Sequence, residues 1–276
     1  SKNAEAANFP FCTIDPNIGI VDVVDERLDQ LTKLSKSKKK IYTNITFVDI
    51  AGLVKGASKG EGLGNKFLSH IREVDAIIHL VRCFESDKIT HVNSKINPVE
   101  DLETIKTEII LSDLDIVQKK LEKGKKKLLE EKEIIILEEK LKQLNDGKEV
   151  DAYDKDEAKF LTTLGLLSIK PKIIVCNVDE ESLAKGNPFT ENVKKNYSEE
   201  KVVTICADIE DQIMGLDKNE RETFMREVGL NKTGLNQLIK EGYDLLNLDT
   251  FFTAGPEESR AWTVKKNTPA SKAASV

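Results

Sequence analysis

The sequence has few aromatic residues, only four cysteines and no long apolar run. Aromatic residues make up 5% of the 276 positions and Trp262 is the single tryptophan, so a surface that stacks nucleic-acid bases is not expected. No apolar run reaches the roughly 18 residues of a membrane-spanning helix, and no secretion leader begins at Ser1. The cysteines lack the paired spacing of zinc or redox sites, so we expect reduced thiols in a cytoplasmic protein without a membrane partner.

A large excess of one charge is also missing. The chain has 42 basic and 48 acidic side chains, which give a net charge of −6, so its overall charge does not favour nucleic acid. Hydrophobic residues make up 39% of the sequence, which is enough to bury a core and excludes a disordered chain. Any contact with RNA is therefore expected to come from a local basic patch.

Short apolar runs alternate with helical patterns along the chain. Three of these runs, at 77–81, 173–176 and 202–206, are almost continuously apolar, as is typical of strands buried on both faces. Two further runs, at 18–24 and 41–50, also indicate strands. Helical patterns between them predict an α/β fold with a mostly parallel sheet. Since ligands of such folds bind beyond the carboxyl ends of strands, we expect the site in the loops that follow residues 50, 81, 176 and 207.

One stretch does not fit a sheet. Apolar residues repeat in a heptad pattern at Ile110, Leu114, Val117 and Leu121, and a second such run covers 134–144. This pattern predicts an inserted antiparallel helical hairpin. Residues 119–148 hold ten lysines and seven acidic residues, so the hairpin is locally basic. This charge fits either a solvated helix surface or a contact with RNA phosphate or an acidic partner.

Two strand ends carry side chains suited to a nucleotide. The run ITFVDIAGLVKGA places Asp49 at a strand end, where an acid can hold Mg²⁺, and Gly52 three residues later, where a backbone N–H can approach a terminal phosphate. An Asp-initiated turn is the simpler interpretation. Upstream, Thr13 in FPFCTIDPN could offer its hydroxyl to a metal ion or its N–H to phosphate. No Walker A motif occurs in the chain, and the glycine-rich stretch 56–64 lacks its spacing.

The second strand end is IIVCNVDE, residues 173–180. GTP-binding P-loop proteins carry Asn-Lys-x-Asp here, and this chain has Asn177, Val178, Asp179 and Glu180. The lysine is absent and the last acid is Glu instead of Asp. This change alters how the acid accepts the two N–H groups of guanine, so adenine becomes the reasonable alternative base. A loop of turn-forming polar residues would look similar.

These motifs, in the order FPFCTIDPN, DIAGLVKGA, KGEGLGNKFL, CNVDE and FFTAGPEESRAWT, resemble the YchF/Obg-like ATPase family of P-loop NTPases. The resemblance implies a nucleotide-binding domain in two parts, 1–112 and 150–249, a helical coiled-coil insertion, 113–149, and the start of a β-rich TGS domain, 250–276. It also implies a Walker A loop before Ser1 and most of the TGS domain after Val276. Without that loop, the chain from Ser1 to Val276 is expected to bind nucleotide poorly and to be inactive.

The resemblance assigns roles to matching positions only. It implies that Thr13 and Asp49 hold Mg²⁺ and that Gly52 belongs to the switch II motif. The altered base-recognition motif is Asn177, Val178 and Glu180, and Ala207 lies in the last loop beside the base. These residues would serve a cytoplasmic, ribosome-associated enzyme, bound to the large subunit, that hydrolyses ATP in preference to GTP. The alternative is a non-catalytic interaction module in which nucleotide only orders the structure.

The group that positions the attacking water is not the usual glutamine. Small GTPases carry that glutamine directly after the Asp-x-x-Gly motif, and here the position is Leu53. Of the three histidines, His79 lies inside an expected strand and reads as a core residue, whereas His91 lies in a loop beyond a strand end. We hypothesise that His91 orients or deprotonates the water, with Lys88, Glu85 or a backbone carbonyl as the next candidates.

Overall fold

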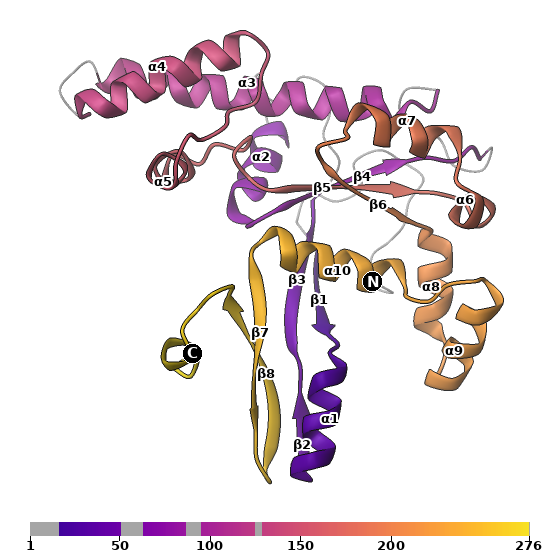
Figure 1. Cartoon of the computed structure of the whole chain (residues 1–276). Coiled ribbons are helices and arrows are strands. Elements are labelled where there is room, and N and C mark those ends of the chain that lie inside the picture. The colour runs from indigo at the N-terminus through magenta and orange to yellow at the C-terminus, as the bar shows by residue number, and fades with distance from the viewer. Residues whose placement is uncertain (1–16, 51–62, 87–94, 125–128, 276) are drawn as a thin grey trace.

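The computed structural model of the chain describes residues 17–50, 63–86, 95–124 and 129–275 (Figure 1). The strands are β1 (Asn17–Val23), β2 (Lys39–Ile41), β3 (Thr43–Asp49), β4 (Ile77–Arg82), β5 (Lys172–Asn177), β6 (Lys201–Ile205), β7 (Leu248–Ala254) and β8 (Glu258–Lys265). The helices are α1 (Glu26–Ser35), α2 (Leu63–Glu73), α3 (Pro98–Gly124), α4 (Glu131–Asn145), α5 (Lys155–Thr163), α6 (Glu180–Lys185), α7 (Pro188–Asn196), α8 (Ala207–Gly215), α9 (Lys218–Glu227), α10 (Gly234–Leu245) and α11 (Ala270–Ala273).

The parallel sheet has the strand order β4-β5-β6. Alternation along β5 sends Ile174 and Cys176 to one face, where they pack in a core with residues of α3, α7 and α8. The neighbouring residues Ile173 and Val175 point to the other face and pack with Leu238 of α10. The expected α/β fold with helices on a parallel sheet is confirmed, because both faces of β5 are buried as its apolar run predicts.

The first strands do not belong to the parallel sheet. β1 pairs antiparallel with β3, and among the described residues these two strands form a sheet of their own. Ile18 and Ile20 are 66% and 68% exposed as residues, so β1 is not buried on both faces. The connection between the two strands holds α1, capped by Asp25, and β2, and the chain then returns along β1 in the opposite direction.

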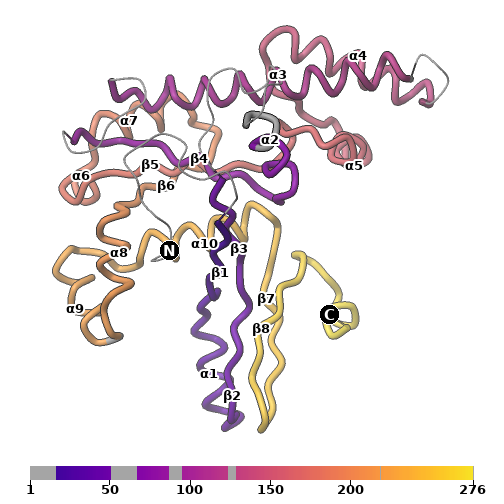
Figure 2. The backbone as a smooth tube through the Cα atoms, turned by 180° about the vertical axis from the view of Figure 1, so that it is seen from behind, coloured from indigo at the N-terminus to yellow at the C-terminus, as the bar shows by residue number. Residues whose placement is uncertain are grey.

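The run 41–50 also divides. β2 ends at Ile41 and pairs in parallel with β8, whereas β3 begins at Thr43. β7 and β8 form an antiparallel hairpin that lies beside α1 and β2 in both views, although the two segments are far apart in the sequence (Figure 2). The hydroxyl of Ser37 joins the two segments: it donates to the Gly255 carbonyl at 2.6 Å and contacts the hydroxyl of the buried Ser259 at 2.7 Å.

The expected helical hairpin is present, with α3 and α4 packed along each other at one end of the molecule (Figure 1). The heptad residues Val117, Leu121, Leu137 and Leu144 are buried between the two helices. α3 begins at Pro98, so its first half lies on the parallel sheet and its second half belongs to the hairpin. In the described part of the chain, no helix is long and apolar enough to cross a membrane.

Candidate functional site

The carboxyl ends of the three parallel strands lie side by side. Arg82 of β4 is in register with Asn177 of β5, and Asn177 is in register with Ile205 of β6. The loops that follow residues 81 and 176 therefore meet at one edge of the sheet, as expected from the sequence. The loop expected after residue 207 is instead α8, which begins at Ala207. Backbone hydrogen bonds continue beyond the strands: Cys83 N–H donates to the Asn177 carbonyl at 2.8 Å, and Val178 N–H donates to the Ile205 carbonyl at 2.9 Å.

Asn177 connects two of these loops through its side chain. Its Oδ1 accepts a hydrogen bond from the backbone N–H of Ala207, the first residue of α8, at 3.0 Å. Val178 is buried, with 2% of its surface exposed, in the position where a GTP-binding motif would carry its lysine. The structure thus brings Asn177, Val178 and Ala207 together, and the side chain of Asn177 holds the β5–α6 loop against the start of α8.

The two acids that follow have different roles. Asp179 is the N-cap of α6, and its Oδ1 accepts the Ser182 N–H at 2.7 Å. Glu180 is the first residue of α6 and is exposed, and within the described part of the chain no group bonds to its carboxylate. Glu180 is therefore the acid of this motif that is available to a ligand.

The loop after β4 is held by residues that lie outside the sequence motifs. Asn187, the N-cap of α7, donates from Nδ2 to the Cys83 carbonyl at 2.6 Å. Arg82 donates from Nε to the Phe84 carbonyl at 3.0 Å and lies over the Phe84 ring, 4.8 Å from its centroid. A sequence signal for Asn187 existed, because Asn-Pro followed by Thr190 is typical of a helix start with a capping box.

Buried thiols lie beneath these loops. Cys83, Cys176 and Cys206 are free and almost fully buried. A hydrogen bond to Cys176, together with burial, raises the pKa of the Cys83 thiol, and burial raises the pKa of Cys206. These two thiols are therefore protonated at neutral pH and pack as small apolar groups.

The remaining predicted residues are not joined to this cluster. Asp49 is the exposed last residue of β3, in the separate two-stranded sheet, and no described residue bonds to its carboxylate. Thr13, Gly52 and His91 lie outside the described residues. His79 is a core residue as expected, with 9% exposure, and burial lowers its pKa to about 4.

No group of three or more metal-binding side chains occurs within residues 17–50, 63–86, 95–124 and 129–275. Mg²⁺ nevertheless fits Asp49, because this ion is commonly held by one or two carboxylates together with waters and phosphate oxygens of a substrate. The unpaired, exposed carboxylate of Asp49 supplies one such ligand.

Comparisons with known proteins agree with this arrangement. Residues 1–120 match the family model described as 50S ribosome-binding GTPase, and residues 248–276 match the C-terminal model of YchF GTPases, described as a protein of unknown function. The chain is 48% identical over 281 residues to "Ribosome-binding ATPase YchF" of Escherichia coli O157:H7, covering 98% of this chain and 77% of the relative. The chain belongs to the YchF family.

Other YchF proteins are similarly close. The Bacillus subtilis (strain 168) protein of the same name is 45% identical, with 99% of this chain and 78% of the relative covered. The solved structure of the Schizosaccharomyces pombe YchF GTPase superposes with a TM-score of 0.83 at 34% identity, covering 98% of this chain and 76% of that one. The YchF fold therefore holds over nearly the whole chain, including the hairpin and the β7–β8 segment.

Proposed function

We propose that this protein is a Mg²⁺-dependent nucleoside triphosphatase that prefers ATP to GTP and acts as a ribosome-associated switch in the cytoplasm. The names of its relatives, ribosome-binding ATPases, support hydrolysis and the ribosome as partner. The matched model of 50S ribosome-binding GTPases supports the large subunit. The base preference rests on this chain's own residues.

The observation that carries the ATP preference is the arrangement around Glu180. The guanine-specific motif uses a short Asp to accept two N–H groups of the base, beside a lysine. Here the lysine position is the buried Val178, Asp179 is occupied in capping α6, and the free acid is the longer Glu180. Because the Glu180 carboxylate is displaced from the position of the usual Asp, one N–H donor of a bound guanine would be left unpaired. An unpaired polar group lowers affinity strongly, so the site would discriminate against GTP. Adenine offers its amine donor without the N1–H, which fits this acid better.

The phosphate side of the site follows from the motif residues. Asp49, directly or through water, and the Thr13 hydroxyl would hold Mg²⁺, which neutralises charge on the phosphate oxygens. The backbone N–H of Gly52 would approach the terminal phosphate. His91 would orient or deprotonate the attacking water in place of the missing glutamine. The Mg²⁺ ligands would thus come from before β1 and from the end of β3, and the groups at the terminal phosphate and the water from after β3 and β4.

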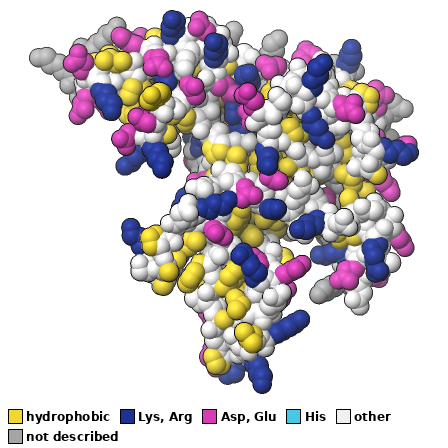
Figure 3. All heavy atoms as spheres, viewed as in Figure 1, with side chains coloured by type: hydrophobic (Ala, Val, Ile, Leu, Met, Phe, Trp, Pro, Cys, Tyr) yellow, Lys and Arg dark blue, Asp and Glu magenta, His cyan; other side chains and the backbone are white. Residues whose placement is uncertain are grey.

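The hairpin is the proposed contact with the ribosome or its RNA. Its lysines can neutralise phosphates, and counterion release would make the interaction sensitive to salt. In the view of Figure 3, basic side chains on the hairpin are interspersed with acidic ones. We therefore place the RNA contact at the lysine-rich residues 119–127 rather than along the whole hairpin.

The test compares Glu180→Asp with Glu181→Asp in the full-length protein. Glu181 lies on the same helix and pairs with Lys185, so its change controls for general effects on α6. Shortening Glu180 should move the ratio of GTP to ATP affinity toward GTP by about tenfold, the worth of one hydrogen bond. An unchanged ratio would refute the base assignment. Nucleotide binding without hydrolysis would instead favour the interaction module.

A further inference from the structure

One long helix joins the nucleotide-binding part of the molecule to the hairpin. α3 has no glycine or proline between Val99 and Lys123, so nothing in its sequence favours a kink. Leu102 in its first half packs in the core of the parallel sheet, and Val117 in its second half packs in the core of the hairpin. α3 is therefore one continuous element that belongs to both cores.

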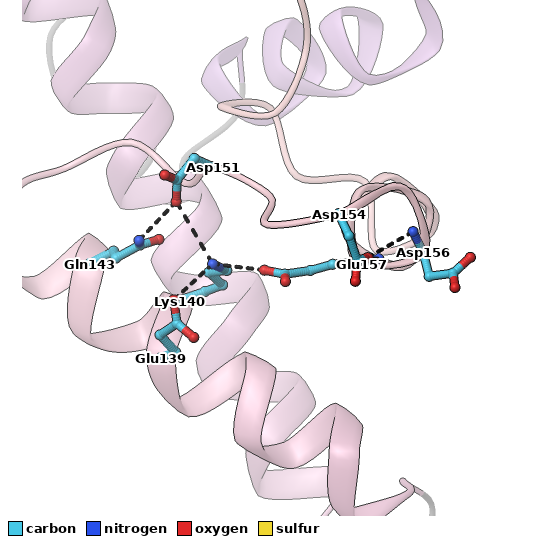
Figure 4. Close-up of polar contacts among 7 residues, drawn as sticks. All are labelled: Glu139, Lys140, Gln143, Asp151, Asp154, Asp156 and Glu157. Atoms are coloured by element: carbon cyan, nitrogen blue, oxygen red, sulfur yellow. Dashed lines mark hydrogen bonds and ion pairs between the residues drawn. The ribbon is translucent and has the colours of Figure 1, made fainter.

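The hairpin and α5 form one packed unit. Leu137 and Leu144 of α4 share a core with Leu161 of α5. Beside this core, the side chain of Lys140 is 2% exposed, and its Nζ lies 2.7 Å from Glu157 of α5 (Figure 4). Glu139 and Asp151 complete the acidic surroundings of this lysine, at 3.1 and 3.8 Å. Since a buried charge resists separation from its partner, α4 and α5 are expected to move together.

A second set of contacts ties this unit to the end of α2. The Arg72 guanidinium donates from Nη2 to the Ser112 hydroxyl of α3 at 2.8 Å. After α5, Lys170 donates from Nζ to the carbonyl of Arg72 at 2.9 Å and also to that of Val74. The buried Asp113, next to Ser112, accepts the backbone N–H groups of Leu167 and Ser168 at 2.8 and 2.9 Å. We call Arg72, Ser112, Asp113, Ser168 and Lys170 the α2–α3 joint.

Apolar packing links the joint to the end of β3. Leu68 and Ile71 of α2 pack against Ile109 of α3, and Ile50 packs against the same cluster. Ile50 directly follows Asp49, the carboxylate that we propose for Mg²⁺. The end of β3 at Asp49 is therefore linked to α2 through Ile50, and α2 in turn contacts α3.

We propose that the α2–α3 joint transmits the nucleotide state to the hairpin, a regulation that rests on the function proposed above. Replacing diphosphate by triphosphate at the end of β3 shifts α2, and Arg72 carries this shift to Ser112. From Ser112 to Lys123 the helix extends roughly 16 Å, so a rotation of about 10° at the joint moves the hairpin end by about 3 Å. The hairpin surface is then presented to its partner differently in the two nucleotide states.

The experiment measures the distance between α4 and α10 in the full-length protein, with the α2–α3 joint intact and with its Arg72–Ser112 contact removed. Spin labels are placed at Glu138→Cys on the exposed side of α4 and at Lys240→Cys on α10, with Cys12→Ser, because the described native cysteines are buried. The label distance should differ by about 1–3 Å between ADP and a non-hydrolysable ATP analogue, because Glu138 lies between the joint and the hairpin end. Ser112→Ala, which removes the hydroxyl partner of Arg72, should reduce this difference by at least half while ATP affinity stays within twofold.

The control is Thr107→Ala, which removes an exposed hydroxyl from the same helix without touching α2. It should leave the nucleotide-dependent distance unchanged. The proposal is overturned if ATP binds but the distance does not respond, or if Ser112→Ala and Arg72→Met both keep the full response. If calorimetry detects no nucleotide binding to the unmodified protein, the proposed function fails, and the joint loses the signal that it would transmit.

Discussion

The Lys140–Glu157 pair offers a sharp test of how the hairpin is held. Both side chains are largely removed from water, with 2% and 11% exposed, and Nζ lies 2.7 Å from Oε1. Lys140→Met keeps the apolar stem, removes the charge and leaves a buried carboxylate without its partner. Breaking a buried ion pair in this way costs about 3–5 kcal/mol, so we expect the melting temperature to fall by roughly 10 °C.

The sign of the pH dependence follows from the pKa of Lys140. Burial opposes its charge, but the Glu157 and Glu139 carboxylates outweigh burial and raise the pKa above 10.5. The stabilisation by the Lys140–Glu157 pair is therefore complete below pH 10.5 and is lost only as the pH rises through the pKa of Lys140 in the folded state. The loss of stability in Lys140→Met should accordingly be the same at any neutral pH.

The assay is thermal unfolding by circular dichroism, with hydrogen exchange to locate the loss. Exchange should become faster in α4 and α5 first, because these helices share the pair. Lys185→Met is the matched control, since its pair with Glu181 is exposed on both sides, and it should cause no measurable change. Glu157→Gln added to Lys140→Met should restore part of the stability. A Lys140→Met protein as stable as the original would refute the reasoning.

Two further predictions concern the core. Burial lowers the pKa of His79 from 6.5 to about 4. The contribution of neutral His79 to folding stability is therefore complete above pH 6.5 and is lost as the pH falls toward 4. About 3 kcal/mol of stability should disappear over this window, and His79→Leu should abolish that part of the pH dependence in denaturant titrations. Gly234→Ala would place a Cβ 2.7 Å from Cγ2 of Ile205, so we expect a loss of about 1–3 kcal/mol by chemical denaturation. Gly215→Ala, where a Cβ meets nothing within 4 Å, should be close to neutral, and equal effects of the two changes would show that crowding against Ile205 is not the cause.

Local patterns in the sequence predicted much of the fold. The continuous apolar run of β5 predicted a strand buried on both faces, and heptad spacing predicted the hairpin. The antiparallel pairing of β1 with β3 was not predicted, because apolar content does not specify a strand's partner. The spacing in α4 does indicate the burial of Lys140, because it lies three residues after Leu137 and four before Leu144, on the face that packs inward.

The candidate site was predicted in part for a similar reason. Strand ends and motif order selected Asn177, Glu180 and Ala207, and the structure adds the hydrogen bond between Asn177 and Ala207. The capping role of Asp179, which leaves Glu180 free, depends on where α6 begins and so required the structure. The α2–α3 joint could not be predicted, because it unites residues that are about 40 to 100 positions apart.

The most direct test of the central claim is a calorimetric titration of the full-length protein with ATP and with GTP, each with Mg²⁺. We predict that ATP binds more tightly, because Glu180 is free and the motif's lysine position is the buried Val178. Tighter binding of GTP would contradict the base assignment while leaving the fold intact. Binding of neither nucleotide would contradict the proposed function and favour a module that only binds a partner.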